Sequence, residues 1–117
     1  MNNIALKLQD IGVPAHVVGY EYLKSTLSIC MDDPAAIRAM TTGLYPAIAK
    51  AHGTTPSKVE RGIRHAIEIC WDRCDISTLA STFGPVVGAR EKRPANAEFI
   101  AALAALAEQL RMEGDGS

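Results

Sequence analysis

Apolar residues recur at the three- and four-residue spacing of helices along most of the chain, and no segment alternates apolar and polar residues as strands do. Residues at the helical spacing share one face of a helix, so that face is expected to be buried. The clearest such stripe consists of Val59, Ile63, Ala66, Ile67 and Cys70. The pattern predicts an all-α protein, a compact bundle of about six helices.

Glycines, prolines and capping residues divide this pattern into separate helices. Helices are expected over residues 2–11, 18–31, 34–41, 44–52, 56–73, 76–83 and 97–112. The second of these should bury Tyr22, Leu23, Leu27 and Cys30. Asp33 and Asn96 are the expected N-caps of the third and last helices, and Thr42-Gly43 should interrupt the chain after the third. No repeat or low-complexity linker occurs, so residues 1–117 are expected to form one domain.

The stretch 45–71 has the pattern of a helix-turn-helix unit. Counted from its first residue, Ala49 is fifth, where a larger side chain would push the two helices apart. Gly53 is ninth, where the chain must reverse and glycine enters the left-handed region at little cost. Thr55 is placed to cap the second helix, with a proline at its first position, and Val59 should face the angle between the helices. Together these positions predict a DNA-binding unit.

The second helix of this unit carries its polar residues opposite the buried stripe. They are Ser57, Lys58, Glu60, Arg61, Arg64, His65 and Glu68. Recognition helices contact bases mainly through their N-terminal half. Arginine can bind guanine through two hydrogen bonds, and glutamate can accept one from cytosine, so Glu60, Arg61, Arg64 and the adjacent His65 are the expected base contacts. Ser57 and Lys58 are the expected phosphate contacts. Without the preceding turn, an ordinary solvated helix face would be the better interpretation.

The net charge of −1 argues at first against nucleic acid as a partner, but the distribution of charge matters more than its sum. Besides the cations of the second helix, Arg90, Lys92 and Arg93 are close together, just before Pro94. The residue before a proline favours an extended backbone, so this segment should be accessible. It could bind phosphates without reading sequence, or it could simply be a solvated loop. Binding to DNA is expected to be sensitive to salt.

The remaining chemistry of the chain points to no enzyme, metal or cofactor. The three cysteines, Cys30, Cys70 and Cys74, do not supply the four ligands of a usual structural zinc site, and a Cys–His pair would lack an orienting group. Their odd number favours reduced thiols in a cytoplasmic protein. No apolar run approaches the ~20 residues that span a bilayer, so no membrane partner is expected.

Three segments resemble the effector domain of the sporulation master response regulator of endospore-forming bacteria. They are IGVPAHVVGYEYL (11–23), LYPAIAKAHGTTPSKVERGIRHAIEICW (44–71) and RPANAEFIA (93–101). The resemblance extends from about residue 4 to residue 113. It implies an all-α fold of about six helices that binds double-stranded DNA at a short box with the core TGTCGAA and controls entry into sporulation.

The resemblance also implies roles for particular residues. The family's base-reading positions correspond to Glu60, Arg61 and Arg64, with His65 adjacent. Its contact with the RNA polymerase sigma factor corresponds to the segment 75–91, which contains Asp75, Ser77, Ser81, Phe83 and Glu91. The family binds tandem DNA boxes, so a homodimer on adjacent boxes is expected.

Three features depart from the family pattern. No receiver domain is present, so the chain is expected to be either an excised domain or a stand-alone protein. Gly62 lies inside the second helix, where alanine would be more favourable by roughly 1 kcal/mol, and is expected to loosen the helix or to permit close approach to DNA. Cys74 and Pro85 lie at the edges of the segment expected to contact the polymerase. The main alternative is a helical protein-interaction module that uses the helix-turn-helix as a scaffold.

Overall fold

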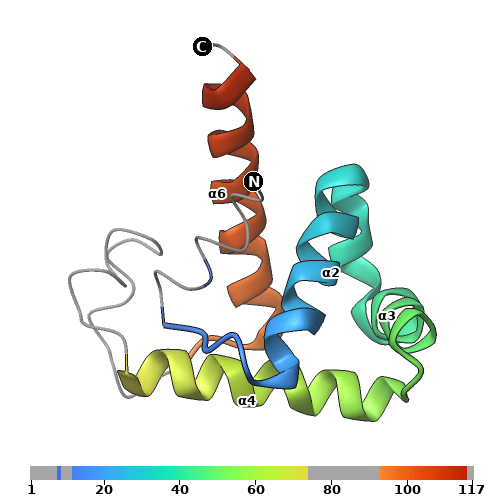
Figure 1. Ribbon diagram of the computed structural model, residues 1–117. Helices are drawn as coiled ribbons and strands as arrows, with labels where there is room; N and C mark the ends of the chain where they lie inside the picture. The colour runs from blue at the N-terminus through green and yellow to red at the C-terminus, as the bar shows by residue number, and fades with distance from the viewer. Residues whose placement is uncertain (1–7, 9–11, 74–92, 116–117) are drawn as a thin grey trace.

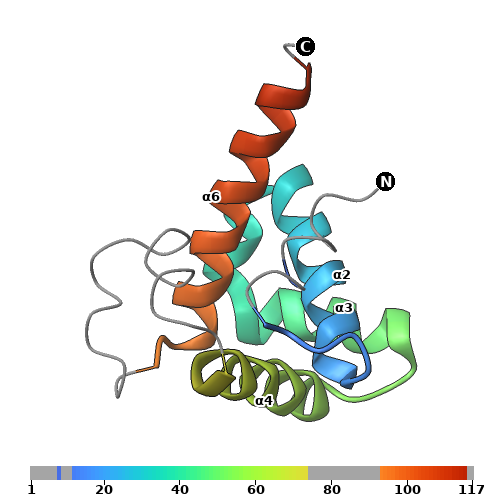
Figure 2. The ribbon, with the colours of Figure 1, turned by 60° about the vertical axis from the view of Figure 1, so that its left-hand side comes forward.

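Three helices form the framework of the protein. In the computed structural model, which describes residues 8, 12–73 and 93–115 (without the side chains of 106, 107 and 109–115), α4 (Pro56–Arg73) lies across one end of the molecule. Both α2 (Val18–Asp32) and α6 (Asn96–Asp115) stand on it side by side (Figure 1). The C-terminal part of α6 extends past the end of α2 in both views (Figure 1, Figure 2). The predicted helices over 18–31 and 56–73 are therefore confirmed.

The turn between α3 (Tyr45–His52) and α4 follows the predicted chemistry. Gly53 adopts the left-handed conformation, with φ 66° and ψ 39°. The N–H of Thr54 donates to the carbonyl of Ala49 at 2.9 Å and the N–H of Gly53 to that of Lys50 at 3.4 Å, which is the Schellman pattern of a helix C-terminus. The Thr55 hydroxyl accepts from the N–H of Lys58 at 3.3 Å, so its predicted role as N-cap is confirmed. Figure 2 looks nearly along α4 while α3 runs across the view, so the two helices meet at a steep angle.

The prediction of an α-helix over 34–41 that breaks at Thr42-Gly43 is wrong. Asp33 does cap the segment, since its carboxylate accepts from the N–H of Ala35 at 3.2 Å. The chain then forms a tight 3₁₀-helix, η1 (Pro34–Ala39), followed by a wide π-helix, η2 (Met40–Leu44), which continues directly into α3. The helix type changes at Ala39, whose φ of −122° and ψ of 47° lie outside the helical region. Gly43 makes no break because its φ is not positive.

The start of α6 also differs from the prediction. Asn96 is the first residue of the helix rather than its N-cap, and Ala95 precedes it as the cap residue. The Ala95 carbonyl accepts from the N–H of Phe99 at 3.0 Å, and the Glu98 carboxylate accepts from the N–H of Ala95 at 2.9 Å. This is the reach-back half of a capping box. The Asn96 side chain is therefore available for contacts with other helices.

Within the described residues the chain is all helical, with no strand, and it forms four α-helices rather than the six or so that were expected. The expected helices over 2–11 and 76–83 lie outside the described residues, apart from Leu8. The Cα radius of gyration, 13.6 Å, is close to the ~13 Å of a compact chain of about this length. No helix in the described part of the chain is both long and apolar enough to cross a membrane.

The core lies where α2, α4 and α6 meet. Every residue of the predicted α4 stripe is buried, as are the four predicted α2 residues. The largest fully buried side chains on the three helices are Leu23, Leu27, Ile63, Phe99 and Ile100. Burial of each stabilises the fold by about 1.5–3 kcal/mol relative to exposure. The helices are thus held together mainly by apolar side chains.

Glycines allow α2 and α4 to approach closely. A Cβ built on Gly19 would overlap the carbonyl oxygen of Gly62 and lie 2.7 Å from the Cβ of Ala66. A Cβ on Gly62 would lie 2.8 Å and 2.9 Å from two ring atoms of the buried Tyr22. The expectation that Gly62 loosens α4 or admits DNA stays a prediction, but the structure gives this glycine a packing role. Gly62 is needed for close approach, but what approaches is α2 inside the protein.

Replacing Gly62 by alanine should destabilise the protein, although alanine favours helix by roughly 1 kcal/mol. The added methyl would force the buried Tyr22 ring to move, and such overpacking costs about 1–3 kcal/mol. We expect Gly62→Ala to lower the free energy of urea unfolding by about 1–2 kcal/mol. Gly43→Ala is the matched control, because its Cβ would meet only the Ala39 Cβ at 3.6 Å and should be neutral or stabilising. A more stable Gly62→Ala protein would contradict the close crossing.

Candidate nucleic-acid interface

The outward face of α4 brings together the predicted base- and phosphate-contacting residues of this helix. Its apolar stripe is buried against α2 and α6, so the opposite side faces solvent. Five of these residues are exposed, namely Ser57, Lys58, Arg61, Arg64 and His65. Glu60 and Glu68, on the same side of the helix, are half-buried. The structure therefore places six predicted site residues, Glu60 included, on one surface.

Arg64 is paired with an acidic residue of its own helix. Its Nη2 atom lies 3.5 Å from Oε1 of Glu60, one turn earlier. The side chains of Arg64 and Glu60 are 57% and 36% exposed, and an ion pair this exposed contributes little to stability. The guanidinium can therefore exchange this carboxylate for another acceptor at small cost. While the ion pair with Glu60 is formed, it limits the directions in which the Arg64 side chain points.

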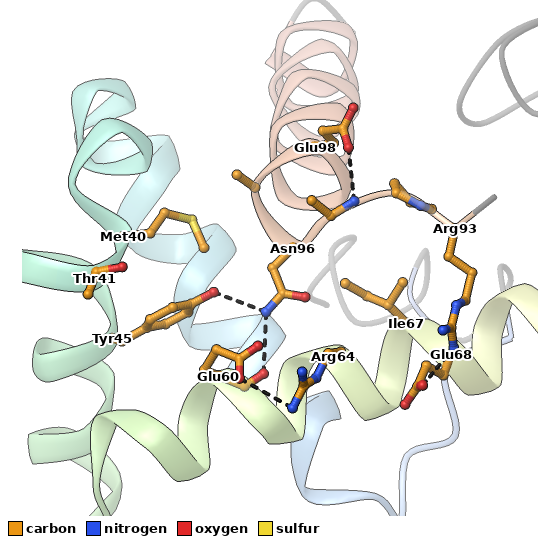
Figure 3. Close-up of a pocket in the computed structure, with 13 residues that line it drawn as sticks. Met40, Thr41, Tyr45, Glu60, Arg64, Ile67, Glu68, Arg93, Asn96 and Glu98 are labelled. Atoms are coloured by element: carbon orange, nitrogen blue, oxygen red, sulfur yellow. Dashed lines mark hydrogen bonds and ion pairs between the residues drawn. The ribbon is translucent and has the colours of Figure 1, made fainter.

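A second ion pair brings Arg93 to the same face. Its Nη1 atom lies 2.6 Å from Oε2 of Glu68, and the other carboxylate oxygen of Glu68 lies 3.9 Å from Nδ1 of His65. Arg93 precedes α6 by three positions, yet this contact holds it beside α4 (Figure 3). The pairing could not be predicted from local sequence, because the partners are 25 positions apart. The role of Glu68 as the acidic partner was not predicted.

An open groove lies between this part of α4, the segment leading into α3 and the start of α6 (Figure 3). Its volume is about 560 Å³, and both the Glu60–Arg64 pair and the Glu68–Arg93 pair line it. A second hollow of about 460 Å³ shares Thr41, Tyr45, Glu60 and Arg64 with the first. The charged face of α4 is thus one side of a groove rather than an isolated ridge.

Asn96 ties three helices together at this groove. Its Nδ2 donates to the Tyr45 hydroxyl at 3.0 Å and to the backbone carbonyl of Glu60 at 3.3 Å. The start of α6 is thereby fixed to the turn of α4 that carries Glu60 and Arg64 (Figure 3). Burial, with a smaller contribution from the Glu60 carboxylate, raises the pKa of Tyr45 above its ordinary value of 10.0, although the bond from Asn96 opposes this. No local sequence signal places Asn96 beside Tyr45.

Several predicted site residues lie outside the described residues. They are the phosphate candidates Arg90 and Lys92 and the polymerase candidates Asp75, Ser77, Ser81, Phe83 and Glu91. Cys74 and Pro85 lie there too. Cys70, in contrast, is fully buried among the core side chains of α4. The roles assigned to the undescribed residues stay predictions.

Comparison with known protein families supplies the identification. The family described as "Sporulation initiation factor Spo0A C terminal" matches residues 4–106, most of the chain. The chain belongs to this family. The resemblance noted from three sequence segments is therefore confirmed over nearly the same range.

Spo0A C-terminal domains are DNA-binding effector domains of a response regulator that act in transcription regulation at the initiation of sporulation. Double-stranded DNA is accordingly the partner of a domain of this family. The family is one of transcription factors rather than enzymes. Of the two interpretations of the sequence, the DNA-binding domain is thus supported and the protein-interaction scaffold is not.

The burial of Tyr45 gives this Spo0A-type domain a specific response to alkaline pH. The pKa of Tyr45 is higher in the folded protein than in the unfolded chain, so protonated Tyr45 stabilises the fold. This stabilisation is complete below the unfolded pKa of about 10, and it is lost as pH rises through the folded pKa. Tyr45→Phe should remove this loss. At pH 7 it should also lower the free energy of unfolding by about 1 kcal/mol, because the hydrogen bond from Asn96 disappears.

Urea unfolding of both proteins between pH 8 and 11 measures the effect. The wild-type protein should lose more stability than Tyr45→Phe above pH 10. Parallel curves would mean that the Tyr45 hydroxyl ionises as readily in the folded protein as in the unfolded chain.

Proposed function

We propose that α3, the Gly53–Thr55 turn and α4 act as a helix-turn-helix unit and that α4 is the recognition helix. The observation that carries this proposal is the division of α4 into a buried stripe and an outward face. The N-terminal half of that face presents the guanidinium groups of Arg61 and Arg64 to solvent. In this position α4 enters the major groove with its capped N-terminus leading.

The side chains on this face then take distinct roles. Arg61 and Arg64 each bind a guanine, and Glu60 orients Arg64 or accepts a hydrogen bond from cytosine, with His65 adjacent. The resemblance to the sporulation regulator supports a box with the core TGTCGAA as the target. Ser57 and Lys58, in the first turn of α4, bind phosphate without reading sequence. Arg90, Lys92 and Arg93 supply further positive charge to the same interface.

Two macromolecular contacts of this Spo0A-type domain rest on the resemblance. One is a homodimer on tandem DNA boxes, and the other is a contact between the segment 75–91 and the RNA polymerase sigma factor. A duplex with two tandem boxes should bind two copies more tightly than two separated boxes do. Equal affinities would argue against the dimer, and failure of the isolated sigma factor to bind the domain on DNA would argue against the polymerase contact.

Loss of either arginine should weaken binding to the box specifically. We expect Arg61→Ala and Arg64→Ala each to cost about 1–3 kcal/mol on a duplex with an intact TGTCGAA box and to relax preference at one base pair. Binding to a scrambled duplex should fall much less, because only phosphate contacts hold the protein there. Fluorescence anisotropy with both duplexes across a salt series measures these affinities.

Lys24→Ala on α2 is the matched control. It removes one positive charge from another helix, where Lys24 pairs with Glu21 at 2.8 Å, and should leave the discrimination between duplexes unchanged. If the wild-type domain binds both duplexes equally, with steep salt dependence, α4 does not read this box. If one arginine variant binds the box as well as wild type, that arginine is not a base contact.

A further inference from the structure

The Glu68–Arg93 pair places an acidic residue on the face of α4 that is proposed to bind DNA, which is a polyanion. This position suggests a role for Glu68. Glu68 lies one helical turn beyond Arg64 on the outward side of α4. Residues this far apart on a helix are neighbours on its surface. The proposed base contacts occupy the N-terminal half of α4, so the next turn lies toward the edge of the groove, where the phosphates are. Glu68 and Arg93 would therefore stand beside the DNA backbone.

We propose that Glu68 limits the strength of DNA binding by holding Arg93 in an ion pair that competes with phosphate. The proposal rests on α4 being the DNA-binding helix. A carboxylate and a phosphate offer the same kind of acceptor to a guanidinium, so Arg93 must give up Glu68, or share its donors, to bind DNA. The pair is close, at 2.6 Å, and both side chains are exposed enough for solvent and DNA to reach them, at 45% and 39%.

The same carboxylate also lies near a second residue of the outward face. Its other oxygen lies 3.9 Å from Nδ1 of His65, one of the predicted base contacts. Glu68 therefore stands between two groups that could face DNA, and it carries a negative charge that the backbone repels. Both effects weaken binding, and both act through phosphates, which carry no sequence information. Glu68 thus sets the overall affinity without changing which box is preferred.

Glu68→Gln tests this inference with little change in shape. Each phosphate neutralised contributes a factor of roughly [salt]^−0.9 to the binding constant. Freeing Arg93 should therefore lower Kd by up to about eightfold at 0.1 M salt and steepen the salt dependence by about 0.9. The gain should be equal on intact and scrambled duplexes. Arg93→Gln alone should not strengthen binding to either duplex, because it frees no cation and leaves the negative charge of Glu68 unpaired.

The decisive measurement is the double variant. In the Arg93→Gln background, Glu68→Gln should lose most of its gain, since the two residues act through one contact. An undiminished gain in that background would mean that repulsion by Glu68 alone weakens binding, and would overturn the competition with phosphate. Weaker binding by Glu68→Gln would overturn it too, because Glu68 would then position Arg93 for DNA. Unchanged binding would remove the pair from the interface.

Two controls separate this inference from other causes. Glu21→Gln on α2 removes the same charge from another exposed ion pair and should leave Kd within about twofold of wild type. Melting temperatures of all variants show that folding is retained. Failure of the proposed function would appear as equal binding of both duplexes by the wild-type domain. The scrambled duplex would still test Glu68, because phosphates are present in both.

Discussion

Where α2 crosses α4, two glycines and an alanine let the two helices approach closely. A methyl group on Gly19 would overlap the backbone of α4, and one on Gly62 would overlap the Tyr22 ring. This steric limit brings Leu23 and Leu27 of α2 into the core formed with α4 and α6. The apolar stripe of α4 determines which side of that helix is buried. The outward face that carries the arginines is the side that this packing leaves uncovered.

Polar contacts then position the parts of the interface that apolar packing does not. The Asn96 amide joins the Tyr45 hydroxyl to the carbonyl of Glu60, so the starts of α3 and α6 are fixed at the same turn of α4. The Glu68–Arg93 pair holds the residues just before α6 beside the next turn. Hydrophobic burial is not directional, whereas these bonds are. They therefore define the position of the surface that is proposed to bind DNA.

The balance of charge on this surface explains how a chain with a net charge of −1 can belong to a DNA-binding family. Arg64, on the outward side of α4, is paired with Glu60. Arg93, beside α4, is paired with Glu68. Affinity that came from phosphates alone would favour every DNA sequence alike. Paired arginines keep their ability to form two directed hydrogen bonds to guanine while adding less to this unselective attraction. The arrangement fits the proposed recognition of one short box among other DNA.

The sequence by itself determined the bounds of α4, its buried stripe, the Gly53 turn and the Thr55 cap, because each depends on residues only a few positions apart. It also placed the candidate arginines on one face. Only the tertiary structure decided that Gly62 faces Tyr22 and that Asn96 bonds across 51 positions to Tyr45 instead of capping its own helix. Capping residues and spacing act within one or two turns of backbone. Which helix lies opposite a residue depends on how all the apolar faces pack together, and no local pattern contains that information.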